Sequence, residues 1–358
     1  MMRYIFLVIL FIFPLCSQAV EVAGLYSARL AVEDQSPAVR KAAIRLVLNK
    51  VVQKVSGRRS VLADTGLQAA LSNTGSYVEQ FQYKKRDDDE SAFWLIVSFQ
   101  KAALDKVLHQ FGVPVWGGNR PDMLVWLAVD EGENRYLVGA NSDEIMEPLN
   151  QAAFDAGMGI TLPLFDLEDQ KALGFNDVWA GFSDQILRAS TRYNAKQILF
   201  GQLLKTQQSS WRIRWTLITP SNQYADLVRA DNADEALKLL FFSLAEKLAD
   251  VYAPYNAAME SMLAFEISGI NGMDQFAQVT QYLSSLDMVK TLNWNQITGD
   301  FITLDLVISG DVSVLKDIIA LNNTLILDIR QQLPTLNTVD SVSPSAQQKI
   351  PTIYYRAN

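Results

Sequence analysis

The sequence predicts an α/β (α+β) protein built from three small mixed-sheet domains in series. Three observations predict this class. The chain has 358 residues, which is enough for two or three domains. Strand-like apolar runs alternate along it with segments whose apolar residues recur at helical spacing. Joints rich in Pro, Gly or polar residues divide it into three blocks, residues 20–115, 122–254 and 262–330.

The first block is an N-terminal α/β domain with one long helix. Ser36 and Pro37 are typical of a helix start, and Ser56-Gly57 is typical of a helix end, so we expect a helix between them. The other expected elements are a strand at 21–26, a helix at 62–71, paired strands at 77–83 and 93–99, and a helix at 102–111. Residues 112–121 are a linker by composition.

The second and third blocks differ in the order of their elements. The second, a central α/β domain, predicts β-α-β-α-β-β-β-α, with strands at 123–129, 157–164, 197–204, 211–219 and 224–229 and helices at 143–156, 178–193 and 233–252. The third predicts β-α-β-β-α-β, the ferredoxin-like arrangement, with strands at 264–268, 289–296, 302–308 and 325–329 and helices at 274–286 and 312–321. Residues 331–358 are rich in Ser, Thr, Pro and Gln, so we expect a disordered tail.

The composition is that of a globular protein and excludes several function classes. Hydrophobic residues make up 49% of the chain and charged residues 20%. There are one His and one Cys, too few for a zinc site built from these residues, for iron–sulfur clusters or for c-type haem. The net charge of −8 argues against nucleic acid as the main partner. We therefore expect no cofactor and no metal.

The N-terminus predicts export. Arg3 is followed by an unbroken apolar run at 4–13, and small residues stand at the −3 and −1 positions of a cleavage site after Ala19. Residues 1–19 therefore read as a signal peptide, and the mature chain is expected in the periplasm. The apolar run is short for a membrane span of about 20 residues. An uncleaved inner-membrane anchor and a lipid-modified Cys16 remain alternatives.

Several motifs resemble a known family. They are Gly24-Leu25-Tyr26, the helix that ends in Ser56-Gly57-Arg58, Val115-Trp116-Gly117-Gly118, and residues 120–127. Together they resemble DUF2066, a family of uncharacterised bacterial proteins with a signal peptide, over most of the mature chain. That resemblance implies no catalytic residues. In outline, the middle block is similar to the N-terminal domain of TolB and of outer-membrane assembly lipoproteins, and the first block to the N-terminal domain of a flagellar assembly protein. Function does not follow from such fold-level likeness.

A cationic helix face is the first candidate interaction surface. Between residues 35 and 64 there are basic residues but no acidic ones, and Lys41, Arg45 and Lys50 share the side of the helix opposite Val51. Such a face is suited to an acidic envelope protein, an anionic membrane or a cell-wall polymer. The alternative is a solvated face whose charges are answered by acids elsewhere in the fold.

Three further features could each have a functional role or only a structural one. Trp211 and Trp215 share a strand parity and are suited to stacking on a sugar, or they fill a core. His109 caps a helix or lies at the surface, since no motif supplies a nucleophile for it. The acidic run at 87–90 lacks the spacing of a calcium loop and reads as a solvated hairpin tip.

These observations favour a non-enzymatic periplasmic interaction or envelope-assembly protein, with an envelope protein as partner. The first alternative is a small-ligand or glycan-binding protein that uses its aromatic residues and domain joints. The second is a carboxylate-based hydrolase, which requires two acidic side chains about 5–9.5 Å apart in a cleft. The sequence leaves the partner, the pathway and the oligomeric state open.

Overall fold

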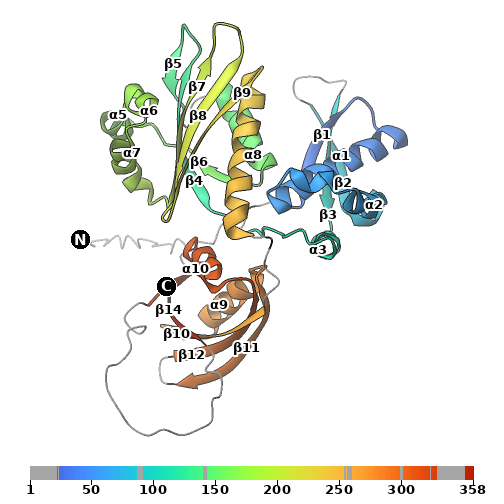
Figure 1. Cartoon of the computed structure of the whole chain (residues 1–358), viewed down its shortest axis with the longest axis vertical. Coiled ribbons are helices and arrows are strands. Elements are labelled where there is room, and N and C mark those ends of the chain that lie inside the picture. Colours follow the sequence, from blue (N-terminus) through green and yellow to red (C-terminus); the bar gives the residue numbers. More distant parts are fainter. Residues whose placement is uncertain are drawn as a thin grey trace, which may run out of the picture.

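The computed structural model describes residues 22, 24–86, 92–139, 143–253, 255, 260–298, 301–322, 324–328 and 351–358. It contains three separate sheets, each with its own helices, so the α+β class with several small domains is confirmed (Figure 1). Among the described residues, no helix is long and apolar enough to cross a membrane. The predicted signal peptide at 1–19 and the acidic run at 87–90 lie outside the described residues.

The first domain is a three-stranded antiparallel sheet covered by a long helix. Its elements are β1 (Ser27–Val32), α1 (Pro37–Ser56), η1 (Ser60–Ala63), α2 (Thr65–Ala70), η2 (Thr74–Tyr77), β2 (Val78–Lys85), β3 (Phe93–Phe99) and α3 (Lys101–Gln110). The sheet order is β1-β3-β2. Of the strand predicted at 21–26, residues 24–26 form a turn in which Gly24 has φ of 71°, and the described strand begins at Ser27.

Both ends of α1 follow the sequence signals. The hydroxyl of Ser36 accepts a hydrogen bond from the backbone N–H of Val39, and Pro37 lies in the first turn. Gly57 ends the helix in the left-handed region, with φ of 67°. The inner face of α1 buries Val47, Val51 and neighbouring apolar residues against β3.

The second domain has a mixed sheet between two helical layers. Its elements are β4 (Asp122–Asp130), β5 (Arg135–Leu137), α4 (Asp143–Asp155), β6 (Gly159–Thr161), α5 (Leu167–Ala172), α6 (Phe175–Ala180), α7 (Ser183–Ser190), η3 (Thr191–Tyr193), β7 (Gln197–Lys205), β8 (Trp211–Ile218), β9 (Gln223–Ala230) and α8 (Ala233–Tyr252). The order is β5-β4-β7-β8-β9, with β6 beside β4. The single helix predicted at 178–193 is two helices, because Gly181 adopts a left-handed conformation with φ of 73°.

The apolar run of β4 is explained by burial on both faces. Met123 and Val125 point into the core shared with α4 and α8. Leu124 and Trp126 point to the other face, into the core shared with α6 and α7. This alternation confirms a central buried strand. Figure 1 shows α8 on one side of the sheet and α5, α6 and α7 on the other.

The third domain has a five-stranded sheet with two helices on one face. Its elements are β10 (Glu260–Ser268), α9 (Met273–Ser285), β11 (Val289–Thr298), β12 (Phe301–Ser309), α10 (Val312–Ala320), β13 (Leu325–Leu327) and β14 (Thr352–Ala357). The order is β11-β12-β10-β14-β13. The predicted β-α-β-β-α-β sequence is present, with one strand added from the C-terminus.

This added strand corrects the reading of residues 331–358 as a disordered tail. Of these residues, 331–350 lie outside the described part of the chain, but 352–357 form β14, which pairs in parallel with β10 and separates it from β13. Ile353 and Tyr355 are 3% and 2% exposed. Residues 352–355, Thr-Ile-Tyr-Tyr, are of types enriched in strands, but the polar composition of the longer segment outweighed this signal, and the partner strand β10 lies far away in the sequence.

Candidate functional site

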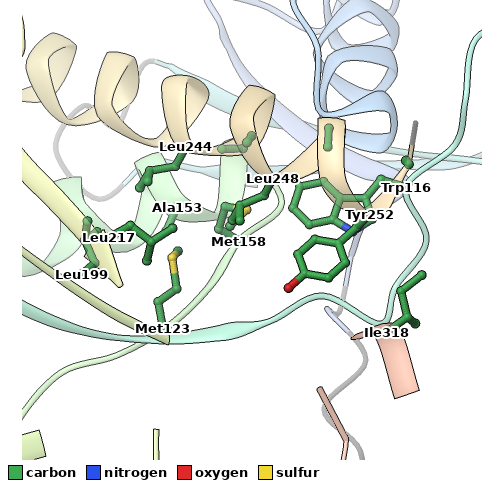
Figure 2. Close-up of a cluster of buried hydrophobic side chains, with 14 of the residues drawn as sticks. Trp116, Met123, Ala153, Met158, Leu199, Leu217, Leu244, Leu248, Tyr252 and Ile318 are labelled. Carbon is green, nitrogen blue, oxygen red and sulfur yellow. The ribbon is translucent and has the colours of Figure 1, made fainter. Parts of the chain in front are cut away.

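The segment between the first two domains is packed against both. Residues 112–121 were predicted as a linker, but Trp116 and Arg120 in it are only 2% and 4% exposed. The ring of Trp116 stacks on Tyr252 of α8, with centroids 6.0 Å apart and planes 12° apart (Figure 2). The backbone N–H of Trp116 donates to the carbonyl of Val55 at 2.8 Å. The reading as a simple linker is therefore corrected: this segment is where the domains meet.

The buried guanidinium of Arg120 joins three parts of the chain. Its Nη2 donates to the carbonyls of Lys54 and Trp116, at 2.8 and 2.7 Å. Its Nη1 donates to the carbonyls of Gly157 at 3.1 Å and Ala156 at 3.4 Å. Burial lowers the pKa of Arg120 to about 9, so the group remains protonated at neutral pH. The carbonyls of Lys54, Ala156 and Gly157 lie at the C-terminal ends of α1 and α4, where backbone acceptors lack helical partners.

Arg58 makes a similar contact with α8. Its Nη2 donates to the carbonyls of Ala249 and Ala253, both at 2.9 Å, and to the carboxylate of Asp250 at 3.0 Å. The guanidinium carbon lies 4.5 Å from the centroid of the Tyr255 ring. A cation at a helix C-terminus is favoured by the helix dipole. Arg58 and Arg120 therefore fix the first domain to the second.

Lys54 is a third buried cation at this contact. Its Nζ donates to the carbonyl of Ser27 at 2.9 Å and lies 3.6 Å from the centroid of the Phe154 ring. Burial lowers the pKa of Lys54 to about 7, against the opposing attraction of Asp155. The ammonium therefore titrates near neutral pH.

A charged network connects the first domain to the third. The ammonium of Lys101 donates to Asp105 at 2.7 Å and to Asp287, after α9, at 2.9 Å. The hydroxyl of Tyr26 donates to the other oxygen of Asp105 at 2.6 Å. Burial lowers the pKa of Lys101, but the two carboxylates outweigh it and raise the pKa above its usual value. The ammonium of Lys101 therefore pairs with both carboxylates, and the three side chains form an ion-pair network.

A cavity of about 250 Å³ opens beside this network, where all three domains meet. Its walls include Trp116, Tyr252, Tyr255, His109, Asp287 and Lys290. Among the described residues, no group of three His, Cys, Asp or Glu side chains is placed to hold a metal ion. The lining is mainly aromatic and aliphatic with a few polar groups, which is typical of a ligand site.

His109 lies on the wall of this cavity. It is exposed in the last turn of α3, where the sequence predicted a capping or surface residue. Its ring makes no hydrogen bond to the described part of the chain. Burial lowers the pKa of His109, and the charge of Lys290 lowers it further.

The predicted cationic face of α1 is divided by the structure. Lys41 and Arg45 are exposed and form no ion pair with a described residue. Lys50 is half-buried, with its Nζ 3.9 Å from a carboxylate oxygen of Asp155 and 3.4 Å from the carbonyl of Arg29. Lys50 therefore belongs to the contact between domains, which corrects its assignment to the outer surface.

Apolar side chains accompany the two exposed cations. Leu46, next to Arg45, is 54% exposed, and Phe81 of the edge strand β2 is 46% exposed. The guanidinium carbon of Arg40 lies 5.2 Å from the centroid of the Phe81 ring. We call Arg40, Lys41, Arg45, Leu46 and Phe81 the α1 surface.

The two tryptophans of β8 have different environments. Trp215 is 1% exposed and packs in the core under α8, so the prediction that it stacks on a sugar is wrong. A Cβ on Gly201 of β7 would lie 2.6 Å from the carbonyl oxygen of Arg214, so a glycine is needed where β7 passes β8 at this point. Trp211 is half-buried at the start of the strand, with the ammonium of Lys205 5.9 Å from its ring. Its role in binding stays a prediction.

Sequence reasoning missed the buried cations and the network. Arg120 does carry a signal, because a charged residue stands there among Gly, Pro, Trp and apolar neighbours. Lys54 and Arg58 carry none, since they read as part of a solvated basic run. Asp287 meets Lys101 across the domain contact, at a sequence separation that no local pattern reports.

The family that matches this chain covers its first domain. The model of a family described as a domain of unknown function, DUF8605, matches residues 19–117, a stretch that ends inside the joint segment. No curated protein matches. A solved structure titled "Crystal structure of uncharacterized protein" is 14% identical and covers 37% of this chain and 90% of that chain, with a TM-score of 0.16. The resemblance to DUF2066 stays a prediction.

Proposed function

We propose that this chain is a non-enzymatic interaction protein of the bacterial cell envelope, acting in the periplasm, and that its α1 surface captures an acidic protein partner. The observation that carries the proposal is the pair Lys41 and Arg45, exposed beside Leu46 without an ion-pair partner among the described residues. The whole chain has a net charge of −8, so this local cationic patch runs against the average.

The chemistry of the surface fits a protein interface. Exposed Leu46 and Phe81 supply apolar area that a partner buries, and such area gives most of the affinity. The neighbouring cations steer an acidic partner and fix its orientation. Scattered single apolar residues are normal on a surface, but here Leu46 follows the exposed Arg45, and Phe81 lies against the guanidinium of the half-buried Arg40.

Contacts between the first two domains hold the helix that carries the α1 surface in place. The outer side of α1 is exposed, while its C-terminal end is held by Arg120 and Gly57 packs against Ala249 of α8. A rigid helix loses little conformational freedom on binding, which favours affinity.

The test is capture of partners from solubilised envelope by the purified full chain. We expect the variant with Lys41→Gln, Arg45→Gln and Leu46→Ser to lose capture. A matched control carries Lys171→Gln and Arg188→Gln, which removes two positive charges from exposed positions on α5 and α7. Capture by the control should equal that of the parent.

Two outcomes count against this proposal. Equal capture by the parent and the α1 variant would overturn it. Binding to vesicles of anionic lipid that depends on the α1 surface, with no protein captured, would assign the surface to a membrane. A true acidic partner is also expected to be released by rising salt, because surface charges are screened over about 10 Å at 0.1 M.

A further inference from the structure

The cavity at the three-domain junction is separate from the α1 surface. It lies where the end of α3, the joint segment, the end of α8 and the turn from α9 to β11 meet. None of the α1 surface residues lines it. Trp116 and Tyr252 form a stacked pair on its wall, and Figure 2 shows Ile318 of the third domain across from them.

An unpaired buried donor belongs to this wall. Trp116 is 2% exposed, and its indole N–H has no hydrogen-bond acceptor in the described part of the chain. Leaving a buried donor unpaired is unfavourable by about 1–3 kcal/mol, so such groups are usually satisfied by a partner. Trp116 is one of the residues that line the cavity.

The charged groups around the cavity favour an anion. The ammonium of Lys290 makes no ion pair with a described residue, and it lies on the lining together with His109. Asp287 is the acid of the lining, and its carboxylate is held by Lys101. Lys101 also holds Asp105, so these two acids share one ammonium, and Lys290 is the lysine of the lining that has no ion-pair partner among the described residues.

The size and surface of the cavity set the rest of the ligand. About 250 Å³ lies below the roughly 300–1,000 Å³ of drug-sized sites, so the occupant is small. Aromatic rings of Trp116, Tyr252 and Tyr255 favour a flat or branched apolar group, which gains from burial and from ring contacts.

We propose that the junction cavity binds a small aromatic or branched apolar carboxylate, with its apolar group against Trp116 and Tyr252 and its carboxylate toward the Trp116 N–H and Lys290. The chemical class includes the C-terminal residue of a peptide. Binding there bridges the first, second and third domains. The site therefore links ligand binding to the rigidity of the whole chain.

The test is calorimetric titration of the full chain with N-acetyl-phenylalanine and with N-acetyl-phenylalaninamide, each to about 5 mM. We expect the acid to bind about tenfold or more tightly than the amide. Lys290→Gln removes the unpaired ammonium at an exposed position and is expected to weaken binding of the acid about fivefold or more. Trp116→Phe keeps a ring but removes the N–H and should also weaken it.

The matched control is Lys106→Gln, which removes one exposed charge from the same helix as His109. It should bind the acid as the parent does. The proposal is overturned if neither compound binds, if acid and amide bind equally, or if Lys290→Gln and Lys106→Gln have the same affinity. The α1 variant should bind the acid like the parent, so this test is independent of the proposed partner.

Discussion

The guanidinium of Arg120 donates a 2.8 Å hydrogen bond to the backbone carbonyl of Lys54, in the last turn of α1. The same side chain donates to carbonyls just after α4. Arg58 does the same for the end of α8. Helix ends carry carbonyls without helical partners, and here buried arginines from other segments satisfy them. The domains are thus joined by capping one another's helices.

Replacing Arg120 should test this joint. We expect Arg120→Met to lower the free energy of unfolding by about 3 kcal/mol or more, because it leaves several buried carbonyls without donors. Arg120→Lys should not restore stability, since an ammonium lacks the planar fork that reaches both helix ends. Arg188→Met, at an exposed position of α7, should change stability by less than about 0.5 kcal/mol in the same urea titration. Equal effects of the two Met variants would rule out this role.

Lys54 should make stability depend on pH. Its pKa is about 7 when folded and 10.5 in the unfolded reference, so between these values the unfolded chain binds more protons and stability rises with pH. Lys54→Met cannot be protonated, so the difference in unfolding free energy between variant and parent should shift by about 3 kcal/mol in favour of the parent between about pH 6.5 and about pH 9.5. Urea unfolding at both pH values measures this, with Lys106→Met as the exposed control. If the difference in unfolding free energy between Lys54→Met and the parent did not change with pH, Lys54 would not be buried with a lowered pKa.

Alanine substitutions at Gly57 and Gly112 distinguish the cost of backbone strain from the cost of a steric clash. Both have φ of 67°. A Cβ on Gly57 would lie 2.7 Å from the Cβ of Ala249, whereas nothing described lies within 4 Å of one on Gly112. Gly112→Ala should therefore destabilise by about 1 kcal/mol from the left-handed conformation alone. Gly57→Ala should lower the free energy of unfolding by about 2 kcal/mol more than Gly112→Ala does, because the first domain must move away from α8. Thermal unfolding of both variants measures this. If both variants lost the same free energy of unfolding, the contact between the first domain and α8 would accommodate the added methyl group without cost.

Tyr355 and Arg356 test the C-terminal strand. They are neighbours on opposite faces of β14, with Tyr355 2% exposed and Arg356 exposed. We expect Tyr355→Ala to destabilise the third domain by about 3–5 kcal/mol, as truncation of a large buried aromatic does. Arg356→Ala should have little effect. If both variants unfold like the parent in chemical denaturation, residues 352–357 do not belong to the core.

The local part of the fold could be predicted from the sequence. Ser36, Pro37 and Gly57 set the ends of α1, since capping and the left-handed turn act within a few residues. The strand predicted at 93–99 is β3, with the bounds that the structure shows. The candidate sites were predicted less well. Lys41 and Arg45 are exposed as expected, but Lys50 contacts Asp155 of the second domain, and Trp215 is buried under α8 of its own domain.

By itself the sequence determined the α+β class, the three domains and most helices and strands, because these depend on periodicity and on caps close in the chain. Only the tertiary structure decided that Arg120, Lys54 and Arg58 are buried, that 352–357 complete the third sheet, and that Lys101 meets Asp287. Those outcomes depend on segments far apart in sequence that come together in the fold. A charged residue looks the same in the sequence whether it faces water or the end of another domain's helix.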